Sequence, residues 1–238
     1  GFLGGGGQGL AWLALDPKLD RMLVGKRFQA GRSMSRRALC ALEATFAAQA
    51  KVAAMTSVVP QIYRVQNFEG AVWLLLEFVE GVSLQSLQAE QKITMGDSQI
   101  LLIVMDLLKT LMALEGAGLV HGDVVPGNIL VNAQGHIRLI DFSSSVLRGA
   151  PRPTAGAPGF ERDSGAIAEF ADDQYALGCL IYWLLAANLP VTTCDQRGQR
   201  LVSRAEKPEG CTGCANLLWA SAAILTSRDE IKAGVLSS

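Results

Sequence analysis

The chain has 238 residues, half of them hydrophobic, so it can bury a substantial core in one domain or in two small lobes. Its 21 basic and 22 acidic residues give a formal net charge of −1, which argues against a nucleic-acid-binding surface or an anionic-membrane surface. No uninterrupted apolar run reaches the length of a bilayer span, so we expect no membrane insertion by this segment. The five cysteines, few and odd in number, favour the reducing cytoplasm, either for this protein or for the cytosolic domain of a larger one.

The first third of the chain has the pattern of strands with one helix. It opens on a glycine-rich stretch with no strand length before it, so we expect the strand that leads into it to be truncated. A polar Asp-Pro turn at residues 16–20 separates the first two predicted strands. The predicted elements are strands at residues 10–15, 21–28, 60–65 and 71–78, a turn at 67–70, and an alanine-rich helix at 35–55.

After Gly81 the pattern becomes mainly helical. Residues 97–116 place apolar side chains at the spacing of one buried helical stripe, and Asp97 is the expected cap of this helix. Residues 149–165 contain three prolines and four glycines and are predicted to form a loop. The stripe consists of Ile100, Ile103, Leu107 and Leu111, and further helices are predicted at residues 173–187 and 217–231.

Two polar loops on either side of a predicted hairpin carry the strongest chemical signal. The first is His121-Gly-Asp-Val-Val-Pro-Gly-Asn128, and Asp141 follows thirteen residues after Asn128. Strands at 129–131 and 137–140 would bring the two loops side by side. Phosphoryl transfer needs a carboxylate that orients the accepting hydroxyl, and oxygen ligands that hold magnesium against nucleotide phosphates. Asp123 fits the first role and Asn128 with Asp141 the second; the alternative is two unrelated surface acids.

A glycine motif and a lysine near the start of the chain are consistent with the same chemistry. The motif Gly4-x-Gly6-x-x-Gly9 precedes a predicted strand rather than a helix, which argues against a dinucleotide-binding site. It favours a hairpin loop over phosphates, because glycines let backbone N–H groups approach closely. Lys26, seventeen residues after Gly9, is placed to pair with phosphates. A flexible linker and an exposed strand lysine are the alternatives.

In this order, the pieces resemble the protein-kinase superfamily over nearly the whole chain, and in particular the bacterial eukaryotic-like Ser/Thr kinases. Residues 76–81 are similar to the family's hinge, residues 156–160 to the end of its activation segment, and residues 173–178 to the helix that follows. The resemblance implies one domain with a two-lobed α+β fold. An N-lobe of antiparallel sheet plus one helix would span residues 1–78, and a mainly helical C-lobe would span residues 79–238.

The resemblance also implies ATP and Mg²⁺ as cofactors, and a protein substrate or a regulatory protein as partner. Asp123 would position the accepting hydroxyl, Lys26 would hold the α- and β-phosphates, and Asp173 would anchor the catalytic loop through its amides and His121. The glycines would cover the phosphates, Ala11 and Leu130 would sandwich adenine, and the backbone of Glu77 and Val79 would bond to it. The implied nucleotide-binding residues are Gly4, Gly6, Gly9, Ala11, Lys26, Glu77, Val79 and Leu130, and the implied metal ligands are Asn128 and Asp141.

Several positions depart from the family pattern. Val125 and Ala157 stand where active members usually have a lysine and a threonine near the catalytic aspartate. Removing one preorganised electrostatic group costs roughly 3–4 kcal/mol of barrier, so we expect slow transfer with nucleotide binding intact. Gly122 replaces an arginine that receives a phosphate on the activation loop in many kinases. The usual Ala-Pro-Glu ending is missing. Glu161 could take the place of its glutamate and pair with Arg228, but we favour the interpretation that both are ordinary charges on loop surfaces.

The helix partner of Lys26 stays open between two residues. Glu43 is the only acid on the predicted helix at 35–55. Phe46-x-x-Gln49 matches the family's local spelling better, and we favour Gln49 for the position. A glutamine would hydrogen-bond the lysine without supplying a charge.

Three functions compete. The first is an ATP- and magnesium-dependent protein kinase acting on Ser or Thr, possibly a slow one. The second is a pseudokinase, a nucleotide-binding regulatory or scaffolding module, which draws on Val125, Ala157 and Gln49. The third is a small-molecule kinase of the aminoglycoside or choline type, which often shares the His-Gly-Asp spelling. Residues 156–160 and 173–178 argue against the third, because such segments belong to kinases of protein substrates.

Overall fold

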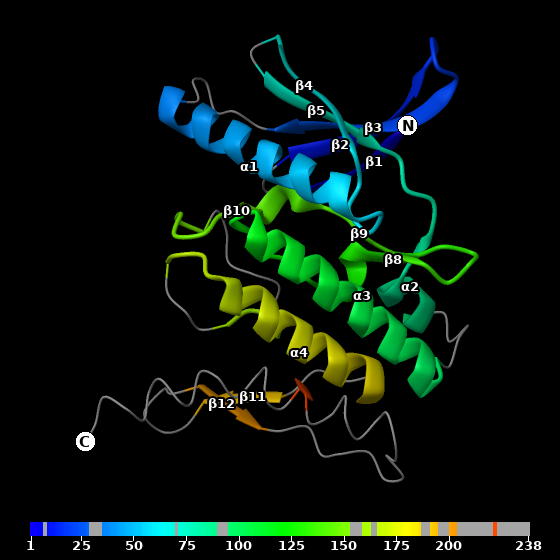
Figure 1. The fold of residues 1–238 in the computed structure, drawn as a ribbon, viewed down its shortest axis with the longest axis vertical. Helices are drawn as coiled ribbons and strands as arrows, with labels where there is room; N and C mark the ends of the chain where they lie inside the picture. Colours follow the sequence, from blue (N-terminus) through cyan, green and yellow to red (C-terminus); the bar gives the residue numbers. More distant parts are fainter. Residues whose placement is uncertain are drawn as a thin grey trace.

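The chain forms two lobes, a sheet with one helix above a mainly helical part (Figure 1). A computed structural model describes residues 1–6, 9–28, 35–69, 71–89, 95–152, 159–162, 166–186, 191–194, 200–203 and 221–222. The two-lobed α+β fold expected from the sequence is therefore confirmed. The helix predicted at 217–231 lies outside these residues except for its positions 221–222.

The N-lobe is a five-stranded antiparallel sheet in the order β1-β2-β3-β5-β4. The predicted turn at 16–20 is confirmed, because Asp16 pairs with Arg21 across it. The turn predicted at 67–70 is too long, since Phe68 already pairs with Ala71 and Glu69 between them has a φ of 49°. The strands are β1 (Phe2–Gly6), β2 (Gly9–Asp16), β3 (Arg21–Phe28), β4 (Ile62–Phe68) and β5 (Ala71–Glu77).

The glycine motif belongs to the β1–β2 hairpin, in agreement with the predicted hairpin. Gly4 and Gly6 belong to β1, where Gly6 pairs with Gly9 at the start of β2. A Cβ atom on Gly9 would come within 2.5 Å of the backbone oxygen of Arg27. The close approach of β2 to β3 therefore requires glycine at this position.

Helix α1 (Arg36–Met55) confirms the predicted helix at 35–55 and covers the sheet. The hydroxyl of Ser35 accepts a bond from the backbone N–H of Ala38 and caps its start. The ring of Phe46 packs on the ring of Phe28 with their centroids 5.3 Å apart. By length and composition α1 alone among the described helices would suffice to cross a membrane, with a mean hydropathy of 1.2, and 33% of that stretch is buried within the fold.

The C-lobe is built on two long helices and short strand pairs. The predicted hairpin at 129–131 and 137–140 is confirmed, because Ile129 pairs with Leu139. The helix predicted at 173–187 begins earlier, at Phe170. The helices are α2 (Leu84–Ala89), α3 (Asp97–Gly116) and α4 (Phe170–Ala186), and the strands are β6 (Val82–Ser83), β7 (Leu119–Val120), β8 (Ile129–Val131), β9 (Ile137–Leu139), β10 (Val146–Leu147), β11 (Val191–Cys194) and β12 (Arg200–Ser203).

The cap predicted for α3 was wrong. Gly96, not Asp97, is the cap residue, and its backbone N–H donates to Oε1 of Gln99 at 3.0 Å. Asp97 lies inside the first turn, where its carboxylate meets the positive end of the helix dipole. The start of the helix is thus satisfied by a glutamine three residues further on.

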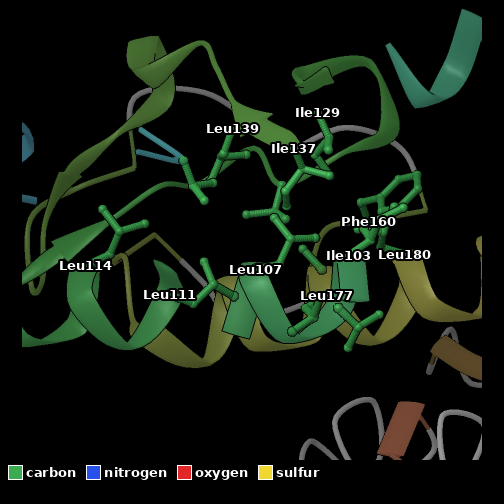
Figure 2. Packing of buried hydrophobic residues seen from close by; sticks show 14 of the residues in the cluster. Ile103, Leu107, Leu111, Leu114, Ile129, Ile137, Leu139, Phe160, Leu177 and Leu180 are labelled. Atoms are coloured by element: carbon green, nitrogen blue, oxygen red, sulfur yellow. The ribbon is translucent and has the colours of Figure 1, made fainter. Parts of the chain in front are cut away.

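The main core lies between α3, α4 and the β8–β9 hairpin. All four stripe residues predicted on α3, from Ile100 to Leu111, are buried. Figure 2 shows Leu107 of α3 facing the hairpin that carries Leu139, with Leu177 of α4 beside it. The hairpin that separates the two polar loops therefore rests directly on this core.

Replacing Leu107 with alanine tests the importance of this packing. Leu107 is fully buried, so Leu107→Ala is expected to lower the free energy of unfolding by about 3 kcal/mol. Leu102→Ala on the same helix is the matched control, since Leu102 is 67% exposed and its loss is expected to stay within about 0.5 kcal/mol. Urea denaturation followed by circular dichroism measures both, and equal losses would contradict the proposed core.

Candidate active site

A cavity of about 600 Å³ opens between the lobes, a size suited to a nucleotide-sized ligand. It collects most of the predicted site residues from distant parts of the chain. Gly6 and Asn128 are not among its lining, although both adjoin residues that are. The predicted residues that line it are Gly4, Gly9, Ala11, Lys26, Glu77, Val79, Asp123, Leu130 and Asp141.

One wall of the cavity is apolar and lies near the crossing between the lobes. Ala11 of β2 and Leu130 of β8 line it from opposite lobes, as expected for a flat ring held between them. Glu77 and Val79, at and after the end of β5, line the cavity where the chain passes from one lobe to the other. The two lobes thus contribute one apolar side chain each to the same space.

The carboxylate of Glu77 is committed to holding the lobes together. It accepts from Nη2 of Arg138 on β9 at 2.7 Å and from the backbone N–H of Gln61 at 3.0 Å. Burial acts to raise its pKa, but these bonds outweigh burial and the pKa is lowered. Arg138 was missed by the sequence reasoning, because an isolated arginine 61 residues away carries no local signal.

The first polar loop is held in place by a buried carboxylate. Oδ2 and Oδ1 of Asp173 accept the backbone N–H groups of His121 at 2.7 Å and Gly122 at 2.8 Å, as predicted for the anchor of this loop. Burial raises the pKa of Asp173 to about 7, and the two amide bonds act in the opposite direction. Gly122 has a φ of 77°, and a Cβ there would lie 2.9 Å from the backbone oxygen of Ser144. The loop conformation accordingly demands glycine at this position.

The ring of His121 is fully buried within the same loop. Its Nδ1 accepts the backbone N–H of Asp123 at 3.2 Å, and its edge packs on the ring of Phe142 at 4.5 Å between centroids. Burial lowers the pKa of His121 to about 4, so the ring is neutral near pH 7. The imidazole therefore sets the backbone of Asp123, while its own backbone N–H bonds to Asp173.

Asp123 and Asn128 are linked directly. Nδ2 of Asn128 donates to Oδ2 of Asp123 at 2.8 Å and to its backbone oxygen at 3.0 Å. Burial raises the pKa of Asp123, and Asp141 raises it further, while Asn128 and Lys26 lower it. A carboxylate with a raised pKa is suited to accept a proton from a hydroxyl. The position at Val125 holds a half-buried apolar side chain packed against the main core, not a cation.

The second polar loop presents Asp141 in a strained backbone conformation. Asp141 has a φ of 63°, in the left-handed region that few non-glycine residues adopt, and such strain clusters at functional sites. Its Oδ1 accepts from the hydroxyl of Ser143 at 2.5 Å and from the backbone N–H of Ser143 at 3.1 Å. Burial acts to raise the pKa of Asp141, but the opposing effects of Lys26 and Ser143 are larger together. The pKa is therefore lowered and the carboxylate stays charged.

Lys26 forms an ion pair with this carboxylate. Its Nζ bonds to Oδ1 of Asp141, and this is the ion pair that Lys26 makes among the described residues. In this conformation the partner of Lys26 is therefore Asp141, and neither Glu43 nor Gln49 takes that place. Glu43 is exposed on α1, and Gln49 is buried with no hydrogen-bond partner for its Oε1 in the part of the chain described here.

The hairpin brings the two loops together as predicted, because the backbone N–H of Ile140 donates to the backbone oxygen of Asn128 at 2.8 Å. Among the described residues, no group of three or more His, Cys, Asp or Glu side chains forms a complete metal site. Asp141 and the amide oxygen of Asn128, together with phosphate oxygens of a nucleotide, would supply the kind of oxygen donors that magnesium prefers. The predicted positions at Ala157 and Arg228 lie outside the described residues.

Comparisons with known proteins agree with this geometry. The family profile described as "Protein kinase domain" matches residues 1–212. The chain is 28% identical over 219 residues to serine/threonine-protein kinase D of Synechocystis sp., covering 83% of this chain and 42% of that protein. It is 30% identical over 198 residues to serine/threonine-protein kinase PknL of Mycobacterium bovis, covering 79% and 48%. The chain thus spans less than half the length of these relatives.

The buried ring of His121 predicts a pH dependence of stability. Its pKa of about 4 in the fold lies below the ordinary 6.5, so the unfolded chain binds more protons between these values. The stability gained from the neutral ring is present above pH 6.5 and is lost as the pH falls towards 4, by up to about 3 kcal/mol. His121→Asn keeps an acceptor and does not titrate, so we expect a flatter profile.

Chemical denaturation of the wild type and His121→Asn across pH 4 to 7 measures this difference. Asp173 works in the opposite direction, because its raised pKa makes stability fall as the pH rises towards 7. This contribution is shared by both proteins and cancels in the comparison. Parallel profiles for the two proteins would contradict the assignment of a neutral, buried His121.

Proposed function

The chain belongs to the protein kinase family, and from this premise we propose that it transfers the γ-phosphate of ATP to serine or threonine hydroxyls of a protein, with magnesium. The observation that carries the proposal is the meeting of Lys26, Asp123 and Asp141 in one cavity. They come from β3, from the loop after β7 and from the loop after β9. A lysine, a carboxylate base and a metal-binding carboxylate are the parts that phosphoryl transfer requires.

In the proposed reaction, the carboxylate of Asp123 accepts a hydrogen bond from the substrate hydroxyl and orients its oxygen for attack. The bond from Asn128 holds that carboxylate at 2.8 Å, and the neutral ring of His121 holds its backbone. Magnesium, when bound with the nucleotide, neutralises the charge that develops on the phosphates. Burial keeps the pKa of Asp123 above its ordinary value, which favours proton acceptance as the hydroxyl attacks.

The ion pair between Lys26 and Asp141 supports an exchange of partners when nucleotide binds. In this structure each charge compensates the other, and the side chain of Lys26 is only 12% exposed. A nucleotide would give the ammonium group phosphate oxygens, and magnesium would give the carboxylate a cation. The hydroxyl and amide of Ser143 would continue to orient the carboxylate.

Serine or threonine specificity rests on the names of the relatives, which are serine/threonine-protein kinases. The same names argue against the small-molecule alternative, and nothing in the comparisons favours a pseudokinase. Val125, in place of the usual lysine, supports slow transfer, because a cation beside the γ-phosphate is absent at that position. The reducing cytoplasm remains the proposed location.

Two isosteric substitutions separate nucleotide binding from transfer. Asp123→Asn removes the carboxylate base but keeps a side chain of the same size and shape. We therefore expect phosphate transfer to fall by roughly 10²–10⁴-fold while ATP still raises the melting temperature. Asp141→Asn tolerates the left-handed backbone, so we expect it to fold and to lose the magnesium dependence of the ATP-induced shift. Thermal shift with ATP, with and without magnesium, measures binding, and radiolabelled transfer to serine, threonine and tyrosine peptides measures activity.

Asp106→Asn on α3 is the control, because Asp106 is 44% exposed and pairs only with Lys109 three residues away among its ion-pair contacts in the described chain. We expect this variant to match the wild type in both assays. ATP binding without any transfer by the wild type would contradict the proposed activity and favour a pseudokinase. Transfer that survives Asp123→Asn would contradict the role of Asp123.

A further inference from the structure

Two arginines bind the carboxylate of Asp172 beside the catalytic loop. Nη2 of Arg152 and Nε of Arg162 both bond to Oδ1 of Asp172, the latter at 2.9 Å. The three side chains are 19%, 11% and 10% exposed, so the interaction is largely removed from water. Its other oxygen, Oδ2, accepts the backbone N–H of Glu169 at 2.8 Å. Asp172 thus bonds to both arginines and to the chain entering α4.

The two arginines lie near opposite ends of one segment. A short antiparallel ribbon joins those ends, with Gly149 N–H donating to the backbone oxygen of Ala168 and Arg152 N–H to that of Ala166, both at 2.9 Å. Residues 149–169, which begin after β10 and end at α4, are therefore closed at their base by backbone bonds. The carboxylate of Asp172 adds a side-chain bond to each of the two arms of this segment, the one that carries Arg152 and the one that carries Arg162. We call this arrangement of Arg152, Asp172 and Arg162 the arginine clamp.

The arginine clamp is directly connected to the catalytic loop. Asp173 follows Asp172 in the same turn of α4 and accepts the amides of His121 and Gly122. A small cavity of about 40 Å³ is lined by Asp123 and by all three residues of the arginine clamp, so the clamp and the proposed base border the same space. Displacement of the segment end would consequently be felt at the site where a protein substrate meets Asp123.

The arginine clamp is electrostatically coupled to Asp173, the anchor of the catalytic loop. The guanidinium groups of Arg152 and Arg162 both bond to Asp172, and Asp173 is its neighbour in the chain, so these four largely buried side chains form one coupled set. Arg152 lowers the pKa of Asp173, while Asp172 raises it. Removing one member of such a set leaves a buried charge without compensation, which is costly.

We propose that Asp172 is a positioning residue for phosphoryl transfer, fastening both arms of residues 149–169 to the catalytic loop without a phosphate. The proposal rests on the proposed kinase function. The catalytic loop itself carries Gly122 at the position where many kinases have the arginine that receives a phosphate. Instead, Arg152 and Arg162 both belong to residues 149–169. The anion that they bind together is the carboxylate of Asp172, not a phosphate.

Asp172→Asn tests the charge of this side chain separately from its bond to the backbone of Glu169, because the amide oxygen can still accept that N–H. We expect kcat/KM for a phosphate-accepting peptide to fall roughly 10- to 100-fold, with the KM for ATP unchanged within twofold. Arg162→Gln, which leaves the pair of Arg152 with Asp172 in place, is expected to show the same selective loss. Asp172→Glu restores the charge and is expected to recover part of the activity.

Glu169→Gln is the matched control, because Glu169 pairs with Arg148 nearby but on the surface, with side chains 40% and 59% exposed. It is expected to leave both kinetic constants unchanged. Wild-type protein treated with phosphatase is expected to keep its activity, since the clamp needs no phosphate. Loss of activity on phosphatase treatment, or unchanged kinetics in both Asp172→Asn and Arg162→Gln, would overturn the proposal.

Limited digestion with trypsin tests the clamp without relying on catalysis. We expect Asp172→Asn to be cleaved after Arg162 at least severalfold faster than the wild type, and Glu169→Gln to be cleaved at the wild-type rate; the bond after Arg152 is not a trypsin site, because Pro153 follows it. If the three proteins show this cleavage pattern but the wild type transfers no phosphate, the kinase proposal is refuted, while the role of Asp172 in holding residues 149–169 stands. Equal cleavage of all three proteins would overturn the clamp itself.

Discussion

The carboxylate of Asp173 is the interaction on which the site depends. It lies at the start of α4, 52 residues from the backbone N–H of His121 that it accepts, and it is almost completely buried. Burying a carboxylate is unfavourable unless donors surround it, and the amides of His121 and Gly122 supply them. The loop that carries Asp123 is therefore held by α4, and α4 is held by the main core.

Ion pairs join the lobes around the cavity. Lys26 of β3 meets Asp141 beyond β9, and Glu77 at the end of β5 meets Arg138 on β9. In addition, the backbone N–H of Leu139 donates to the backbone oxygen of Val58 between α1 and β4 at 2.8 Å. The β8–β9 hairpin thus touches the N-lobe through charged and backbone groups, while its apolar face packs on α3. This double attachment places the two polar loops at the floor of the cavity.

Local patterns predicted most of the elements because each pattern has its cause within a few residues. The apolar stripe from Ile100 to Leu111 follows helical spacing, and all of it is buried. Predictions failed where a neighbour decided the outcome. Gly96 caps α3 in place of Asp97, and its backbone N–H donates to the side chain of Gln99. Either alternative satisfies local rules equally well, so the sequence pattern alone does not choose between them.

The sequence by itself identified Asp123, Asn128 and Asp141 as the candidate site residues, because they occur at a spacing that a single hairpin can close. It also identified Asp173 as the anchor of the loop through the family resemblance. Only the tertiary structure decided the partners, since charges pair by distance in space and not along the chain. Lys26 pairs with Asp141 rather than with Glu43 or Gln49, and Asp172 gathers arginines from ten and twenty residues away.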